Sequence, residues 1–160
     1  RWRENIALAL EVDATGTVVR AVVAHPGHPT ILSAATRCLL LLSADAAHAR
    51  AIASANGADV VLDSLSRLLR NENRDDEDES ALLWRRALHL IDRLCEHPAA
   101  VARVATQATL TAVCAAVDQE EGARRRNVEE APALLLGASI LDKATRSAAG
   151  LRHASRALEE

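Results

Sequence analysis

The stretch from Ala47 to Leu69, AHARAIASANGADVVLDSLSRLL, carries the pattern that decides the fold. It reads as a short helix, a glycine at position 57, and a longer helix whose apolar residues recur three and four apart. We expect Gly57 to close the first helix, Ala46 to Asn56, in the left-handed conformation that glycine adopts without steric cost. The pattern therefore predicts two helices that meet at a sharp bend.

Two other segments have the same design. Glu4 to Val23 reads ENIALALEVDATGTVVRAVV, and Ala99 to Val117 reads AAVARVATQATLTAVCAAV, without the glycine. A third helical segment follows each copy. These three segments match near their ends, in LLLLS (39–43), IDRLC (91–95) and LDKAT (141–145). Internal similarity of this kind is typical of stacked helical repeats.

The pattern resembles the armadillo repeat, a unit of three helices. In that family a short first helix meets the second at a sharp bend, and the third helix lines the concave groove of a superhelix. Val19 and Leu62, in consecutive second helices, are 43 residues apart, within the ~40–47 residue window of this repeat class. The resemblance implies an all-α, right-handed α-solenoid of about three armadillo-like repeats, as a segment of a longer array. Another α-solenoid and a compact helical bundle are the alternatives.

We expect residues 1–160 to form one domain, with repeats at about 4–43, 46–95 and 98–147. Residues 148–160 would then start a further repeat or form a cap helix. An acidic loop is expected at 71–79 and a charged loop at 119–127. Ile91 to Leu110 is only 19 residues, about one helical turn short, which predicts a merged or two-helix, HEAT-like unit at that bend. Apolar faces at both ends, and Arg in place of Met at position 1, favour further repeats or a partner chain there.

Local signals add to this scheme. Thr30 and Ser80 are expected to cap two of the third helices, and Pro98 to lie in the first turn of a helix. The third helices also carry a stripe that we expect to face the core: Ala35, Leu39, Ala87, Ile91 and Leu141.

Composition excludes several classes of protein. Hydrophobic residues make up 49% of the chain, yet it has two Trp and no Tyr, Phe or Met. A core of Ala and Leu suits closely packed helices and disfavours a β-sandwich. A net charge of −3 gives no basic field for nucleic acid, and no apolar run approaches the ~18 residues of a membrane span. Cys38, Cys95 and Cys114 lack zinc-type spacing, so we interpret them as small apolar residues of an intracellular, cytoplasmic protein; nuclear and cytoskeletal locations stay open.

The sequence predicts no enzyme, no cofactor and no metal site. His25, His28 and His97 are interpreted as turn residues because no cluster has ligand spacing. Cys95 and His97 are close in sequence, but no acid–base–nucleophile set or oxyanion loop accompanies them. The leading prediction is a non-catalytic protein–protein interaction scaffold that binds a partner through the concave face or the ends.

The resemblance also implies a binding face. In armadillo proteins that bind extended peptides, a Trp and, four residues later, an Asn project from each third helix. The Trp positions align here with Arg37, His89 and Ser139, and the Asn positions with Leu41, Arg93 and Lys143. This sequence therefore has neither the row of Trp nor the row of Asn. The basic members instead form a stripe that suits an acidic or phosphorylated protein segment. The alternative is a solvated face in which they pair with Asp92 and Asp142.

Two other functions stay open. One is an armadillo-type Hsp70 co-chaperone, a nucleotide-exchange cofactor whose curved face embraces the nucleotide-binding lobe. The other is a stacking structural subunit of a cytoskeletal, ciliary or other large assembly, which would bind through its ends. The acidic run from Asn71 to Glu79 is expected to be a solvated loop or, alternatively, a docking tag for a basic partner.

Overall fold

The computed structural model describes residues 2–71, 77–104, 106, 109–111, 113–114 and 132–146. Within these ranges every regular element is an α-helix and no strand occurs, so the all-α prediction is confirmed. Among the same residues, no helix has both the length and the apolar character needed to span a bilayer.

The first three helices are α1 (Trp2–Glu11), α2 (Ala14–Ala24) and α3 (Pro29–Leu42). Asp13 adopts a left-handed φ of 48° between α1 and α2, and its Oδ1 accepts a hydrogen bond from the Gly16 N–H at 3.1 Å. A Cβ at position 16 would lie 2.5 Å from Asp13 Oδ2, so this cap requires glycine there. His28 is the N-cap residue of α3, and the expectation that Thr30 caps it is wrong. Pro29 starts the helix because its fixed φ suits the first helical position.

The quoted stretch forms α4 (Ala46–Ser54) and α5 (Gly57–Asn71). Two helices meet at a bend, as predicted, but the role expected of Gly57 is wrong. Asn56 takes the left-handed conformation, with φ 53°, and Gly57 is the first residue of α5. A Cβ on Gly57 would lie 2.7 Å from Ile52 Cγ2, so glycine is needed there for close approach of the two helices.

The expected loop at 71–79 is wrong at both ends. Asn71 is the last residue of α5, and α6 (Glu77–Cys95) already begins at Glu77. Ser80 therefore lies inside α6 and does not cap it. Acidic residues are favoured in the first turn of a helix, so an acidic run suits a helix start as well as a loop. Residues 72–76, 119–127 and 148–160 lie outside the described residues.

The remaining described helices are α7 (Pro98–Val104) and α9 (Pro132–Thr145), with further helical residues at 109–111 and 113–114. Pro98 starts α7, as expected. Thr106 is not helical, and its Oγ1 accepts a hydrogen bond from the Thr109 N–H at 3.1 Å. The helix of α7 is thus not continuous with the helical residues that follow Thr106.

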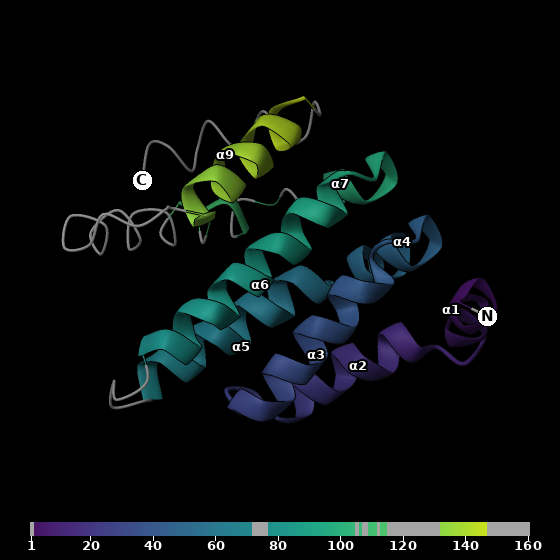
Figure 1. Ribbon diagram of the computed structural model, residues 1–160, viewed down its shortest axis with the longest axis horizontal. Coiled ribbons are helices and arrows are strands. Elements are labelled where there is room, and N and C mark those ends of the chain that lie inside the picture. The colour runs from purple at the N-terminus through teal and green to yellow at the C-terminus, as the bar shows by residue number, and fades with distance from the viewer. Residues whose placement is uncertain are drawn as a thin grey trace.

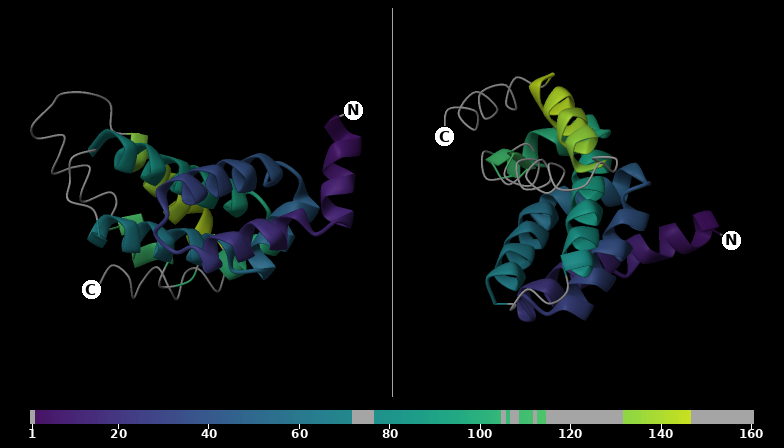
Figure 2. Two further views of the ribbon diagram at one scale, coloured as in Figure 1. Left: turned by 90° about the horizontal axis from the view of Figure 1, so that it is seen from below. Right: turned by 60° about the vertical axis from the view of Figure 1, so that its left-hand side comes forward.

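The helices form two main layers. Helices α3, α6 and α9 lie side by side in one layer, with α6 between the other two, and α2 and α5 lie in the layer behind them (Figure 1). Helix α4 packs against α7. Helix α1 projects from the end of the molecule, and its contacts are chiefly with α2 (Figure 2).

The core confirms most of the predicted inward stripe. Four of its five positions are buried: Ala35, Leu39, Ala87 and Ile91. The expectation for Leu141 is wrong, because Leu141 is only partly buried while Ile140 and Ala144 are fully buried. The reason is the position of α9 at one side of its layer. Its contacts are chiefly with α6, so the residues that turn toward α6 are the ones removed from water.

Candidate functional site

The six residues of the predicted binding face all lie on the layer of α3, α6 and α9. We call them the third-helix face: Arg37, Leu41, His89, Arg93, Ser139 and Lys143. The first four are exposed, whereas Ser139 and Lys143 are half-buried. The structure divides the face into two junctions, one between α3 and α6 and the other between α6 and α9.

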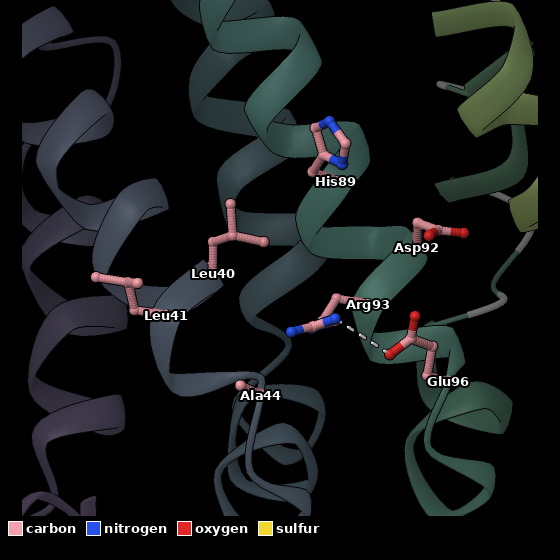
Figure 3. Close-up of a pocket in the computed structure, with 7 residues that line it drawn as sticks. All are labelled: Leu40, Leu41, Ala44, His89, Asp92, Arg93 and Glu96. Atoms are coloured by element: carbon pink, nitrogen blue, oxygen red, sulfur yellow. Dashed lines mark ion pairs between the residues drawn. The ribbon is translucent and has the colours of Figure 1, made fainter. Parts of the chain in front are cut away.

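A pocket of about 330 Å³ lies at the junction of α3 and α6, which we call the α3–α6 pocket. One wall is apolar and comes from the end of α3 and the turn after it: Leu40, Leu41 and Ala44. The other wall is polar and comes from the end of α6 and the residue after it: His89, Asp92, Arg93 and Glu96. Three of the predicted face residues, Leu41, His89 and Arg93, therefore line one pocket (Figure 3).

Arg93 is the cation of this pocket. Its side chain leaves α6 on the side that faces Leu40 and Ala44 (Figure 3). The Nη1 atom lies 3.6 Å from Glu96 Oε2, an ion pair too long for a hydrogen bond. No other side chain of the described residues bonds to the guanidinium, and 47% of the Arg93 side chain is exposed. An arginine has five N–H donors, so this pocket offers unused donors beside an apolar wall.

The junction of α6 and α9 is closed by a polar cluster that we call the α6–α9 clasp: Asp92, Glu96, Ser139 and Lys143. Asp92 Oδ1 accepts hydrogen bonds from Ser139 Oγ and from Lys143 Nζ, both at 2.7 Å. Lys143 Nζ also lies 3.8 Å from Glu96 Oε1. The side chains of Lys143 and Asp92 are only 26% and 18% exposed, so solvent screens this pair less than an exposed one.

The clasp changes the electrostatics expected of the predicted face. Lys143 binds Asp92 on the neighbouring helix, and Arg93 has Glu96 one turn away. Asp142 pairs with Arg146 at 2.6 Å, four residues along the same helix. Acids thus stand beside two of the four basic residues of the stripe. Arg37 and His89 are the exposed members without such an acid among the described residues.

Sequence reasoning missed Leu40, Ala44 and Glu96, and it gave Asp92 only the role of a neutralising neighbour. The three-and-four spacing along α3 and α6 could have indicated the first three, since each lies one turn from a chosen residue. It could not show that Asp92 reaches across to α9, because contact between two helices depends on how they stack.

Two residues that the sequence places close together, Cys95 and His97, have structural contacts in the part of the chain that the structure describes. No group of three metal-binding side chains occurs there. His97 Nε2 lies 3.0 Å from the Ser43 carbonyl oxygen, a bond that joins the turn after α6 to the turn after α3. Burial raises the pKa of the Cys95 thiol to about 12, Lys143 opposes this rise with a smaller effect, and Asp92 adds slightly to it. This thiol therefore stays protonated at neutral pH and serves as a packing group.

No protein-family model, no curated protein and no solved structure matches this chain. The two junctions are therefore the basis on which a function can be assigned.

Proposed function

We propose that this chain is a non-catalytic protein-interaction module that binds a segment of a partner protein on the third-helix face. The observation that carries the proposal is the α3–α6 pocket, which combines an apolar wall with an arginine whose hydrogen-bond donors are unused. Such a combination of aliphatic contact and fixed charge is suited to recognition of a polypeptide side chain.

The arrangement of the helices supports a repeat scaffold of the armadillo-like kind as the framework of this module. Three helices at aligned positions, α3, α6 and α9, lie side by side, and each is the last of a set along the chain. Stacked repeats contact only their neighbours and expose one continuous face, which suits binding of an extended partner. The fold proposal is thus a right-handed α-solenoid of about three repeats, with a partner segment lying across its third helices.

A pull-down with charge-reversal variants tests the proposal. The bait is the 160-residue chain, compared with a variant that carries Arg37→Glu and Arg93→Glu. The matched control is Arg50→Glu with Arg103→Glu, two exposed arginines on α4 and α7. Partners should be lost with the face variant and kept with the control. Equal recovery with both variants would contradict binding on this face.

A second candidate is a stacking subunit that binds through the end formed by α1. The observation that favours it is the exposure of large apolar side chains there, with Leu8 at 56%, Leu10 at 43% and Val12 at 62%. Exposed apolar patches mark interaction surfaces when they are contiguous. Deleting residues 1–11 would abolish assembly in this case, while the face variant would leave assembly intact.

The Hsp70 co-chaperone function stays a prediction. A pull-down against a folded ATPase lobe, compared with extended acidic peptides, would distinguish it from the leading proposal.

A further inference from the structure

We infer that the α3–α6 pocket takes a specific pair of groups, an aliphatic side chain and a neighbouring carboxylate, from a segment of a partner protein. This inference rests on the proposed function and specifies the partner segment: it carries a carboxylate next to an aliphatic residue.

The apolar wall selects the first group. Leu41 is 60% exposed, although other residues of the same helix, such as Leu32 and Leu39, are buried. Together with Leu40 and Ala44 it forms a wall that contains no polar side chain. Covering this wall with an aliphatic side chain removes apolar surface of both partners from water. The pocket volume of about 330 Å³ leaves room for one such side chain and a short acidic one.

Arg93 selects the second group. It is the one arginine or lysine that lines the pocket, and its contact to Glu96 at 3.6 Å leaves its hydrogen-bond donors unused among the described residues. The flat guanidinium fork matches a carboxylate with two parallel hydrogen bonds. Because Arg93 points toward the wall of α3, a bound carboxylate would lie beside the aliphatic side chain and not at a distance from it (Figure 3).

The acids of the pocket argue for a carboxylate and against a phosphate. Asp92 and Glu96 bring two negative charges to the polar wall, and Lys143 neutralises about one of them through the clasp. A phosphate carries close to two charges at neutral pH and would meet the remaining acid. A carboxylate carries one charge, so it meets less of this repulsion while its two oxygens accept hydrogen bonds from Arg93. Glu96 competes with the incoming carboxylate for the same guanidinium, so it sets the affinity of the pocket.

A peptide-display experiment tests this inference directly. A library of random dodecapeptides is selected on the 160-residue chain and counter-selected on Arg93→Glu. Enriched peptides are synthesised with their acid kept, replaced by glutamine, or replaced by phosphoserine, and their affinities are measured by fluorescence polarisation. We expect an aliphatic residue within one or two positions of Asp or Glu, and weaker binding of both replacements.

Variants of the pocket give the quantitative test. Arg93→Gln should weaken binding about tenfold and Leu41→Ser about fivefold. Glu96→Gln should strengthen it about threefold, because the competing acid is removed. Matched controls remove the same groups from exposed positions that do not line the pocket: Arg85→Gln on α6 and Leu135→Ser on α9. Both controls should leave the affinity unchanged.

The outcomes separate this inference from the proposed function. Peptides without an acid, or peptides that prefer phosphoserine, would overturn the inference, and the proposed function would stand if their binding still required Leu41 and Arg93. Peptides that bind all variants equally would overturn both. Failure to enrich any peptide would overturn the inference alone, since the pull-down with full-length partners decides the proposed function independently.

Discussion

The two junctions of the third-helix face occupy aligned positions and yet have opposite character. The match between 39–43, 91–95 and 141–145 pairs Leu40 with Asp92, Ala44 with Glu96, His89 with Ser139 and Arg93 with Lys143. At the α6–α9 junction all four residues join in the clasp. At the α3–α6 junction the four corresponding residues line a pocket.

The difference lies on the leading helix of each junction. Where that helix is α6, the helix and the residue after it present Asp92 and Glu96, and these acids bind Lys143 of α9. Where it is α3, the helix and the turn after it present Leu40 and Ala44 at the same positions. Arg93 of the neighbouring helix α6 then has no hydrogen-bond partner for its side chain among the described residues. The two junctions thus differ at Leu40 and Ala44, which line the pocket at the positions where the clasp has acids. This contrast supports our proposal that the open junction binds the partner, while the clasp joins α6 to α9.

The largest expected effect tests whether both junctions rest on one buried stripe. Ile91 is 1% exposed on α6, the helix shared by the two junctions. Ile91→Asp would bury an unpaired charge and should lower the free energy of unfolding by roughly 3 kcal/mol or more. Leu41→Asp is the control, since Leu41 is exposed in the pocket and should cost less than about 1 kcal/mol. Equal melting temperatures of the Ile91 variant and the parent, by circular dichroism, would refute the assignment of this face.

The clasp should matter more for stability than the cation of the pocket. Asp92→Ala removes the carboxylate that binds the partly buried Lys143 and leaves its Nζ only the 3.3 Å bond to the backbone carbonyl oxygen of residue 92 and the 3.8 Å contact to Glu96, so it should cost about 1–3 kcal/mol, measured by urea unfolding. Arg93→Gln, at the corresponding position of the open junction, breaks only an exposed ion pair and should cost less than about 0.5 kcal/mol. Hydrogen exchange should quicken in α9 for the first variant alone. Similar costs for the two variants would remove the distinction between the junctions.

Converting one junction into the other sharpens the comparison further. Leu40→Asp places an acid opposite Arg93, as Asp92 lies opposite Lys143. We expect the new ion pair to occupy the guanidinium and weaken binding of an acidic peptide about tenfold. Stability should fall by about 1–2 kcal/mol, because Leu40 packs partly against the core and a surface ion pair offsets little of that lost contact. Unchanged peptide affinity, measured by fluorescence polarisation, would show that Arg93 is not the contact.

The sequence was sufficient for the helical class and most of the buried stripe because these signals are local. The three-and-four spacing predicts the helices, and the matched segments predict that Leu39 and Ile91 are buried at equivalent places. The errors are also local and have physical causes. Gly57 was expected to supply a positive φ, but Asn56 tolerates that conformation and the glycine is used for close packing against Ile52. Local pattern cannot distinguish these two uses of glycine.

The site was predictable only in part. Alignment placed Leu41, His89 and Arg93 on one face, and they do line one pocket. It treated Lys143 as equivalent to Arg93, whereas Lys143 is bound by Asp92 from the neighbouring helix. Whether a basic residue is paired depends on its neighbours on other helices. Asp92, the partner of Lys143, is 51 residues away from it in the sequence. Such partners follow from stacking geometry, which spacing along one helix does not contain.

The smallest expected effect concerns a further pair of aligned positions, Ser43 and Cys95, which are both buried. Burial raises the pKa of Cys95 from 9.0 to about 12, so the folded state holds the thiol proton more tightly than the unfolded state does. The stabilisation is complete below pH 9 and is lost as the pH rises from 9 toward 12, at about 1.4 kcal/mol per pH unit.

Cys95→Ser copies the group that the other junction uses, since Ser43 Oγ donates to the Leu40 carbonyl oxygen at 2.8 Å. The parent chain should therefore lose about 1 kcal/mol more than this variant between pH 8 and pH 10 in urea unfolding. Cys38→Ser, at a half-buried cysteine on α3, is the control and should follow the parent. If the parent and the Cys95 variant lose stability in parallel, then the thiol is more accessible than its burial indicates, and the α6–α9 junction is less tightly closed than the clasp implies.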